Sequence, residues 1–224
     1  MAFTLAASVL IGQVPFLLGA AFGSAALLAL VRRRHRLTVL LAAACSLSSP
    51  LAGAFLLLIA LALVGQVGWR RAAALTSALS GLATAAIVGG AGGPFPCPWP
   101  SLAGVLGFGL AAFVMTSPQD RLVRHFALIY AAAGILAFAI PNPIGGNITR
   151  LGKLIALPLA CYLLTGERRQ RQFKAALCAL AALSWTVVPV STAIAHGATD
   201  PSRGAPYYEG LLSFLKTQNP ATGR

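Results

Sequence analysis

The chain has 224 residues, of which 58% are hydrophobic and 9% are charged. Soluble domains carry about 25% charged residues, so this composition excludes an ordinary soluble domain. Apolar stretches of about 17 to 25 residues recur along its length, which predicts an all-α, polytopic helical membrane protein. The net charge of +13 does not indicate nucleic-acid binding, because the basic residues lie in short clusters between the apolar runs.

The apolar runs and the residues that interrupt them predict the order of the spans. Residues 37–67 are too long for one simple crossing, and Ser46–Pro50 interrupts them, so we expect two helices, 37–48 and 51–67. This pair forms a tight hairpin or a broken helix that enters and leaves the membrane on the same side. Besides it, we expect about six or seven spans, and these include residues 14–31, 71–89, 101–116, 123–140, 151–165 and 174–195.

The basic residues predict how the chain is oriented. Four loops collect 12 of the 17 Lys and Arg residues when they are placed on one face: residues 32–36, 70–71, 118–125 and 166–174. An excess of positive charge marks the cytoplasmic face, here of the plasma membrane. The extracytoplasmic face then carries the Gly- and Pro-rich loop at 89–100, the segment at 141–153 and the C-terminal tail.

Two parts of the chain differ in composition. Residues 1–195 are expected to form a transmembrane helical domain, and residues 196–224 an extracytoplasmic polar tail. Within the tail, Leu211, Leu212 and Leu215 share one helical face, which predicts a short amphipathic helix. Such a helix would lie against the membrane surface or against a soluble domain.

The segment at residues 141–153, PNPIGGNITRLGK, is a polar hinge between two apolar runs. Its prolines and paired glycines prevent a continuous helix, and Asn142 and Asn147 suit tight turns or helix starts. Asn147 or Thr149 is expected to cap a helix that begins near Arg150. Capping of this kind would leave free backbone N–H groups beside the guanidinium, a combination that suits a phosphate or a carboxylate.

The hinge also carries positive charge on the face where little is expected. We therefore predict a lipid-phosphate site formed by Asn147, Arg150 and Lys153, with membrane lipids as partners and a polyprenyl-phosphate lipid as a candidate ligand. The alternative is an ordinary loop whose Arg150 and Lys153 snorkel to lipid headgroups. Other polar or aromatic residues expected on this face are Trp99, Asp200, Arg203, Tyr207, Tyr208 and Glu209, and a carboxylate among them could act as a general base.

Several kinds of chemistry lack the residues that they need. The four carboxylates are Asp120, Glu167, Asp200 and Glu209, and because none is expected at mid-membrane, a proton relay has no candidate. The three histidines have no second ligand at helical spacing, and the four cysteines form no CxxC motif. We therefore predict no metal site, no cofactor and no disulfide framework.

Four short motifs carry a resemblance. Residues 12–19 (GQVPFLLG), 47–53 (LSSPLAG), 143–152 (PIGGNITRLG) and 206–208 (PYY) follow one another in an order that resembles a family of uncharacterised actinobacterial integral membrane proteins. That family is similar in layout to the GT-C superfamily of glycosyltransferases, which take sugars from polyprenyl-phosphate donors. Compared with those proteins the chain starts late and stops early, as a fragment or a shortened homologue would.

The resemblance implies a glycosyltransferase-like membrane protein that binds a polyprenyl-phosphate-type lipid at the extracytoplasmic face. It supplies no catalytic residue, because no position here matches a catalytic carboxylate of those enzymes, and whether the chain is itself an enzyme stays open. Two other functions stay open as well. One is a transporter or flippase for a lipid or a small solute, and the other is a non-catalytic membrane scaffold.

Overall fold

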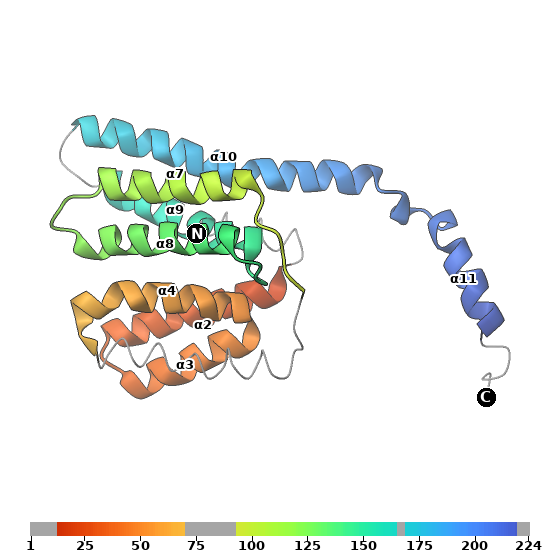
Figure 1. Cartoon of the computed structure of the whole chain (residues 1–224), viewed down its shortest axis with the longest axis horizontal. Helices are drawn as coiled ribbons and strands as arrows, with labels where there is room; N and C mark the ends of the chain where they lie inside the picture. Colours follow the sequence, from red (N-terminus) through yellow and green to blue (C-terminus); the bar gives the residue numbers. More distant parts are fainter. Residues whose placement is uncertain (1–12, 70–92, 165–168, 219–224) are drawn as a thin grey trace. The chain divides into compact units, whose positions relative to one another are not determined.

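A computed structural model describes residues 13–69, 93–164 and 169–218, and the regular elements of these residues are all helices (Figure 1). The predicted all-α class is therefore confirmed. The chain forms two compact units that divide between Thr186 and Val187, inside a helix. In chain order the helices are α2 (Val14–Val31), α3 (His35–Ser48), α4 (Pro50–Val67), α7 (Trp99–Met115), α8 (Arg121–Ala139), η1 (Gly145–Ile148), α9 (Thr149–Leu164), α10 (Arg169–Thr199), η2 (Pro201–Arg203) and α11 (Pro206–Gln218).

The helices lie close to where the apolar runs predict them. Helix α2 has the predicted bounds, and α7, α8 and α9 begin and end within two residues of theirs. Helix α10 is longer than predicted, because the Arg and Gln residues that precede its apolar run are themselves good helix formers. The expected span at 71–89 lies outside the described residues.

The predicted break in residues 37–67 is confirmed at Ser49. This residue is extended, with φ −156° and ψ 113°, and it separates α3 from α4. Its hydroxyl accepts a hydrogen bond from the backbone N–H of Ala52 at 3.3 Å, which makes Ser49 the N-cap of α4. Pro50 follows at the first helical position, where its missing N–H costs no hydrogen bond.

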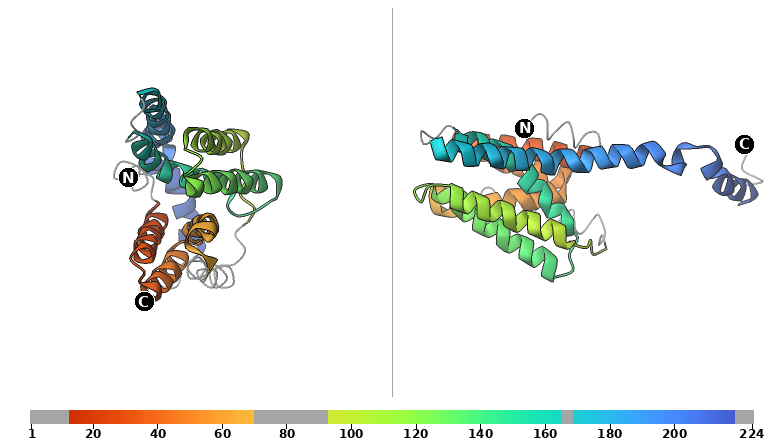
Figure 2. Two further views of the ribbon diagram at one scale, coloured as in Figure 1. Left: turned by 90° about the vertical axis from the view of Figure 1, so that its left-hand side faces the viewer. Right: turned by 90° about the horizontal axis from the view of Figure 1, so that it is seen from above.

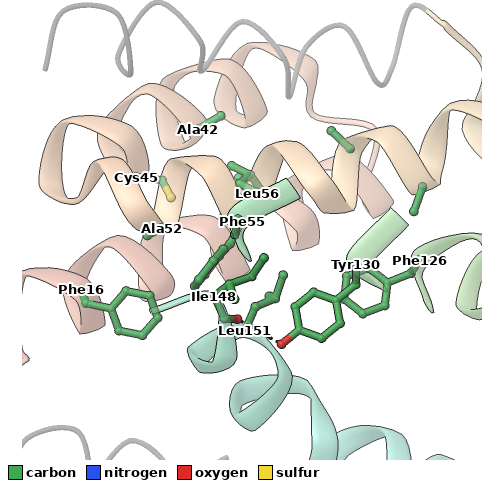
Figure 3. Packing of buried hydrophobic residues seen from close by; sticks show 14 of the residues in the cluster. Phe16, Ala42, Cys45, Ala52, Phe55, Leu56, Phe126, Tyr130, Ile148 and Leu151 are labelled. Carbon is green, nitrogen blue, oxygen red and sulfur yellow. Dashed lines mark hydrogen bonds between the residues drawn. The ribbon is translucent and has the colours of Figure 1, made fainter. Parts of the chain in front are cut away.

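Small residues on α2 let its neighbours approach closely. A Cβ atom added at Gly19 would lie 2.7 Å from the Cβ of Ala52, and one at Gly23 would lie 3.3 Å from the sulfur of Cys45. Helix α2 therefore packs against both α3 and α4, and α4 packs in turn against α8. Figure 3 shows how the buried side chains of these helices, including Phe16 and Tyr130, gather in one core.

The helices of the first unit run between two ends (Figure 1; Figure 2, right). The basic end carries the α2–α3 turn at residues 32–34, with three arginines, and the start of α8, with Arg121 and Arg124. The hinge end carries the loop at 93–98 and the hinge. Helices α3 and α4 leave the basic end and return to it, as predicted. The described basic residues that precede α3 and begin α8 therefore lie at the opposite end of this unit from the hinge.

Among the described residues, two helices are long and apolar enough to cross a membrane, Val14–Val31 and Arg121–Ala139. Their 18 and 19 residues span about 27 and 28 Å, close to the thickness of a hydrocarbon core. Three further apolar helical stretches are shorter: His35–Ser48, Pro50–Val64 and Trp99–Met115. These lengths weakly indicate a membrane protein.

The second unit, Val187–Arg224, contains the end of α10, then η2 and α11. Hydrogen bonds from the Ser202 hydroxyl and from its backbone N–H lower the pKa of the exposed Asp200 carboxyl, which caps η2. The predicted tail helix is present as α11, and its Leu211, Leu212 and Leu215 are all exposed. The association of α11 with a membrane or a soluble domain stays a prediction.

Candidate functional site

The hinge is folded by the side chain of Asn142. Its carboxamide oxygen accepts hydrogen bonds from the backbone N–H groups of Ile144 and Gly145, at 2.9 and 2.8 Å. Its amide nitrogen donates to the carbonyl of Ala137 at 2.9 Å, which ties the turn to the end of α8. Asn142 was predicted to suit a tight turn, and that prediction is confirmed.

The hinge is also joined to the loop that precedes α7. The N–H of Phe95 donates to the carbonyl of Asn142 at 2.9 Å, and the N–H of Gly146 donates to the carbonyl of Pro96 at 3.2 Å. Gly145 has φ +46°, and a Cβ atom there would collide with the Phe95 carbonyl, so only glycine fits. Burial in this loop raises the pKa of the Cys97 thiol.

The prediction that Asn147 or Thr149 caps the next helix is wrong. The 3₁₀ turn η1 leads directly into α9, and the Thr149 hydroxyl donates to the carbonyl of Gly146 instead of accepting an N–H. The backbone N–H of Asn147 donates to the carbonyl of Ile144 at 3.0 Å, and that of Thr149 donates to the carbonyls of Gly146 and Asn147. Because these groups are already paired, an anion near Arg150 would be held by side chains and not by the predicted free N–H groups.

A tyrosine from α8 enters the first turn of α9. The hydroxyl of Tyr130 donates to the carbonyl of Ile148 at 3.0 Å and accepts from the N–H of Gly152 at 3.1 Å. These two backbone groups are four residues apart and would otherwise bond to each other, so the hydroxyl lies within the hydrogen-bond ladder of the helix. Figure 3 shows the Tyr130 ring reaching Ile148 and Leu151 from its stack on Phe126.

The two cations of the predicted site each lie over an aromatic ring. The guanidinium carbon of Arg150 is 5.5 Å from the ring centre of Phe16, on α2. The ammonium of Lys153 is 5.8 Å from the ring centre of Trp185, on α10. Both distances fall within the range of a cation–π contact, which orients a cation without using its N–H donors. Arg150 and Lys153 are both half-buried.

The three predicted site residues share a second property. Asn147 is half-buried like the two cations, and in the described part of the chain none of the three side chains makes a hydrogen bond or an ion pair. Among the described residues of the first unit, the one carboxylate is Asp120. It lies at the start of α8, and the hinge follows the end of that helix, about 28 Å further along its axis. Asp120 accepts a hydrogen bond from the Tyr162 hydroxyl at 3.0 Å. The donors of these three half-buried side chains are therefore not used by the described protein groups.

An apolar groove begins at the ring that carries Arg150. Phe16 lies at this end of the groove, which holds a cavity of about 50 Å³. Its lining comes from α2, α3, α4 and α9: Phe16, Ala20, Gly23, Ser24, Leu27, Cys45, Ala52, Phe55, Leu56, Ile59, Leu151 and Leu154. Figure 3 shows Phe16, Phe55 and Leu151 on three sides of this region.

The remaining residues expected on the same face divide between the two units. Trp99 begins α7 at the hinge end and is 65% exposed, so it belongs to the neighbourhood of the hinge. Asp200, Arg203, Tyr207, Tyr208 and Glu209 belong to the second unit, where the two tyrosine rings meet edge to face at 5.1 Å. The suggested general base stays a prediction.

Three aromatic residues of this region were not predicted. Phe16 lies in the motif at residues 12–19, but nothing in that motif points to Arg150. Trp185 fits between two glycines, because Cβ atoms at Gly104 and Gly152 would lie 3.0 and 2.9 Å from its ring. Tyr130, fully buried, lies within an apolar span. Only tertiary contacts between distant helices bring these rings to the hinge.

No protein-family model, curated protein or solved structure matches this chain. The resemblance drawn from the four short motifs therefore stays a prediction, and so does the glycosyltransferase-like activity that it implies.

Proposed function

We propose that the chain is a multi-pass membrane protein that binds the anionic head of a phosphate-bearing lipid at Asn147, Arg150 and Lys153. The observation that carries this proposal is that the half-buried side chains of Asn147, Arg150 and Lys153 make no hydrogen bond or ion pair with any described residue. Two cations with no carboxylate beside them in the described part of the first unit form a site of positive potential, which favours an anion. A polyprenyl phosphate has the required head and is the ligand that the sequence motifs favour.

The membrane assignment is supported by what the two long helices expose. The core helix of a soluble protein also passes a test of length and hydropathy, but such a helix is mostly buried. Here 33% of Val14–Val31 and 22% of Arg121–Ala139 are buried. Large apolar side chains, among them Leu28, Leu128 and Leu136, are more than half exposed. Such surfaces are stable against lipid.

The remaining features of the proposal follow from the two ends of the first unit. The arginines of the α2–α3 turn and of the first turn of α8 support a plasma-membrane protein with this end in the cytoplasm. The number of about six or seven spans rests on the apolar runs of the sequence. The hinge then lies at the extracytoplasmic face, and the C-terminal tail is assigned to the same face. A glycosyltransferase-like role stays part of the proposal through the motif resemblance alone.

A transport pathway receives less support from the described residues. Broken helices in transporters expose polar groups to a substrate. At the break between α3 and α4 the buried hydroxyls bond locally: Ser46 donates to the carbonyl of Ala42 at 3.3 Å, and Ser49 caps Ala52. The break is therefore satisfied by its own backbone.

The test measures binding of a polyprenyl phosphate by native mass spectrometry to wild type, Arg150→Ala, Arg150→Lys and the control Arg203→Ala. A charge-assisted hydrogen bond contributes about 1.5 to 3 kcal/mol, so Arg150→Ala should weaken binding roughly 10- to 100-fold. The affinity of Arg150→Lys should fall between those of wild type and Arg150→Ala, because Lys keeps the charge but lacks the bidentate fork. Arg203→Ala removes an equal charge from the second unit and should bind like wild type. Equal binding by all four proteins would mean that Arg150 only snorkels.

A further inference from the structure

The apolar groove and the cation of Arg150 are adjacent to each other. Phe16 contributes to both features, since its ring lies under the guanidinium and also lines the groove. Leu151 and Leu154 follow Arg150 on α9 and line the same groove. A ligand held at Arg150 by an anionic head would therefore meet hydrocarbon directly beside that head.

The residues that line the groove extend along two helices. Along α2 its lining runs from Phe16 to Leu27, which is about 16 Å of helix axis. Along α4 it continues through Ala52, Phe55 and Ile59, which repeat at helical spacing. Ser24 is the one side chain with a hydroxyl among the lining residues, and it is exposed at the edge.

We propose that this groove holds the hydrocarbon chain of the lipid whose head is bound at Arg150, an inference that rests on the proposed function. The occupant is a long-chain lipid phosphate, because the cation at the rim selects an anionic head and the apolar lining selects a chain. The site consequently distinguishes a lipid phosphate from a short, water-soluble phosphate ester that carries the same head.

The experiment compares dodecyl phosphate with butyl phosphate, using the full chain in one fixed detergent. Ser24→Phe places a ring at the edge of the groove, and Leu28→Phe places the same ring one turn further along α2 at a position that is 52% exposed and outside the groove. Binding of each phosphate is measured by lipid-dependent thermal shift for wild type, Ser24→Phe, Leu28→Phe and Arg150→Ala. Each phosphate is compared across the variants in the same detergent. Its partition into the micelles is then the same for every variant and does not affect the comparison.

We expect Ser24→Phe to weaken dodecyl phosphate at least 10-fold while changing butyl phosphate less than 2-fold, and Leu28→Phe to change neither. Arg150→Ala should weaken both phosphates. If Arg150→Ala weakens both but Ser24→Phe leaves dodecyl phosphate unchanged, the chain lies elsewhere and this inference fails alone. If Arg150→Ala changes neither, the proposed function fails. Ser24→Phe could instead lower the melting temperature in the absence of ligand and no longer discriminate between dodecyl and butyl phosphate. In that case protein side chains occupy the groove, which also overturns the inference.

Discussion

The insertion of Tyr130 into α9 predicts that Gly152 tolerates no side chain. In Gly152→Ala the new Cβ atom would lie 2.7 Å from the Tyr130 hydroxyl and 2.9 Å from the ring of Trp185. The hydroxyl cannot retreat without lengthening its bonds to Ile148 and Gly152, and the Tyr130 ring is fully buried. Crowding of this kind costs about 1 to 3 kcal/mol, and each weakened hydrogen bond adds about 0.5 to 1.5 kcal/mol.

Helix propensity acts in the opposite direction, since alanine is favoured over glycine by about 1 kcal/mol within a helix. The expected net loss of stability for Gly152→Ala is therefore about 1 to 5 kcal/mol. Gly107 supplies the control, because it also lies within a helix, α7, and a Cβ atom there meets nothing within 4 Å. Gly107→Ala should be neutral or stabilising by up to about 1 kcal/mol.

Both variants would be unfolded in detergent by added dodecyl sulfate, with helix content followed by circular dichroism. Repeating Gly152→Ala in a Tyr130→Phe background removes the hydroxyl from the clash and leaves the contact with Trp185. We expect the two substitutions to couple by about 1 kcal/mol, as residues in contact do. Equal stability of Gly152→Ala and Gly107→Ala would refute the proposed geometry at the start of α9.

Two further predictions concern the break between α3 and α4 and the orientation of the first unit. Pro50 is pre-organised at the start of α4, so Pro50→Ala should destabilise the protein by about 0.4 to 1 kcal/mol in the same denaturation assay, whereas a gain would indicate that the break is strained. In a background without the native cysteines, Pro143→Cys should react with an impermeant maleimide added from outside, and Arg34→Cys should not, because the two positions lie at opposite ends of the first unit. Both positions are exposed, so a difference in labelling reports orientation and not burial. The opposite pattern would reverse the orientation. Pro143 is chosen over Ile148, which also lies in the hinge, because Ile148 is only 2% exposed and a cysteine there would be hard to label.

The helices could be predicted from the sequence because their ends are marked chemically. Helix α2 stops at the arginines that follow Val31, and α4 starts at a Ser-Pro pair. These signals are local, so they can be read without knowing the neighbours of a helix. The break at Ser49 and the helix in the tail belong to the same class of prediction.

The arrangement around Arg150 could not be predicted, because it depends on which faces of apolar helices meet. Helices that are apolar on all sides give no periodic signal for their contact face. The pairing of Arg150 with Phe16 and of Lys153 with Trp185 therefore has no trace in the local pattern. The capping prediction failed for a related reason. The 3₁₀ turn η1 runs directly into α9, so the N–H of Thr149 already bonds to η1 carbonyls, and the N–H of Gly152 bonds to Tyr130 from α8.

The hydrogen bonds between the hinge and the loop at 93–98 have a consequence for how a ligand would reach Arg150. They join the chain segments that connect α7, α8 and α9, and Gly146 packs directly on Pro98 beneath them. The approach along the helix axes is therefore obstructed on the α7 side. On its other side Arg150 borders α2 and the groove, so under the proposed function a lipid would enter laterally, by two-dimensional diffusion within the bilayer. Exchange rates would then follow the mole fraction of the lipid in the membrane and not its concentration in water.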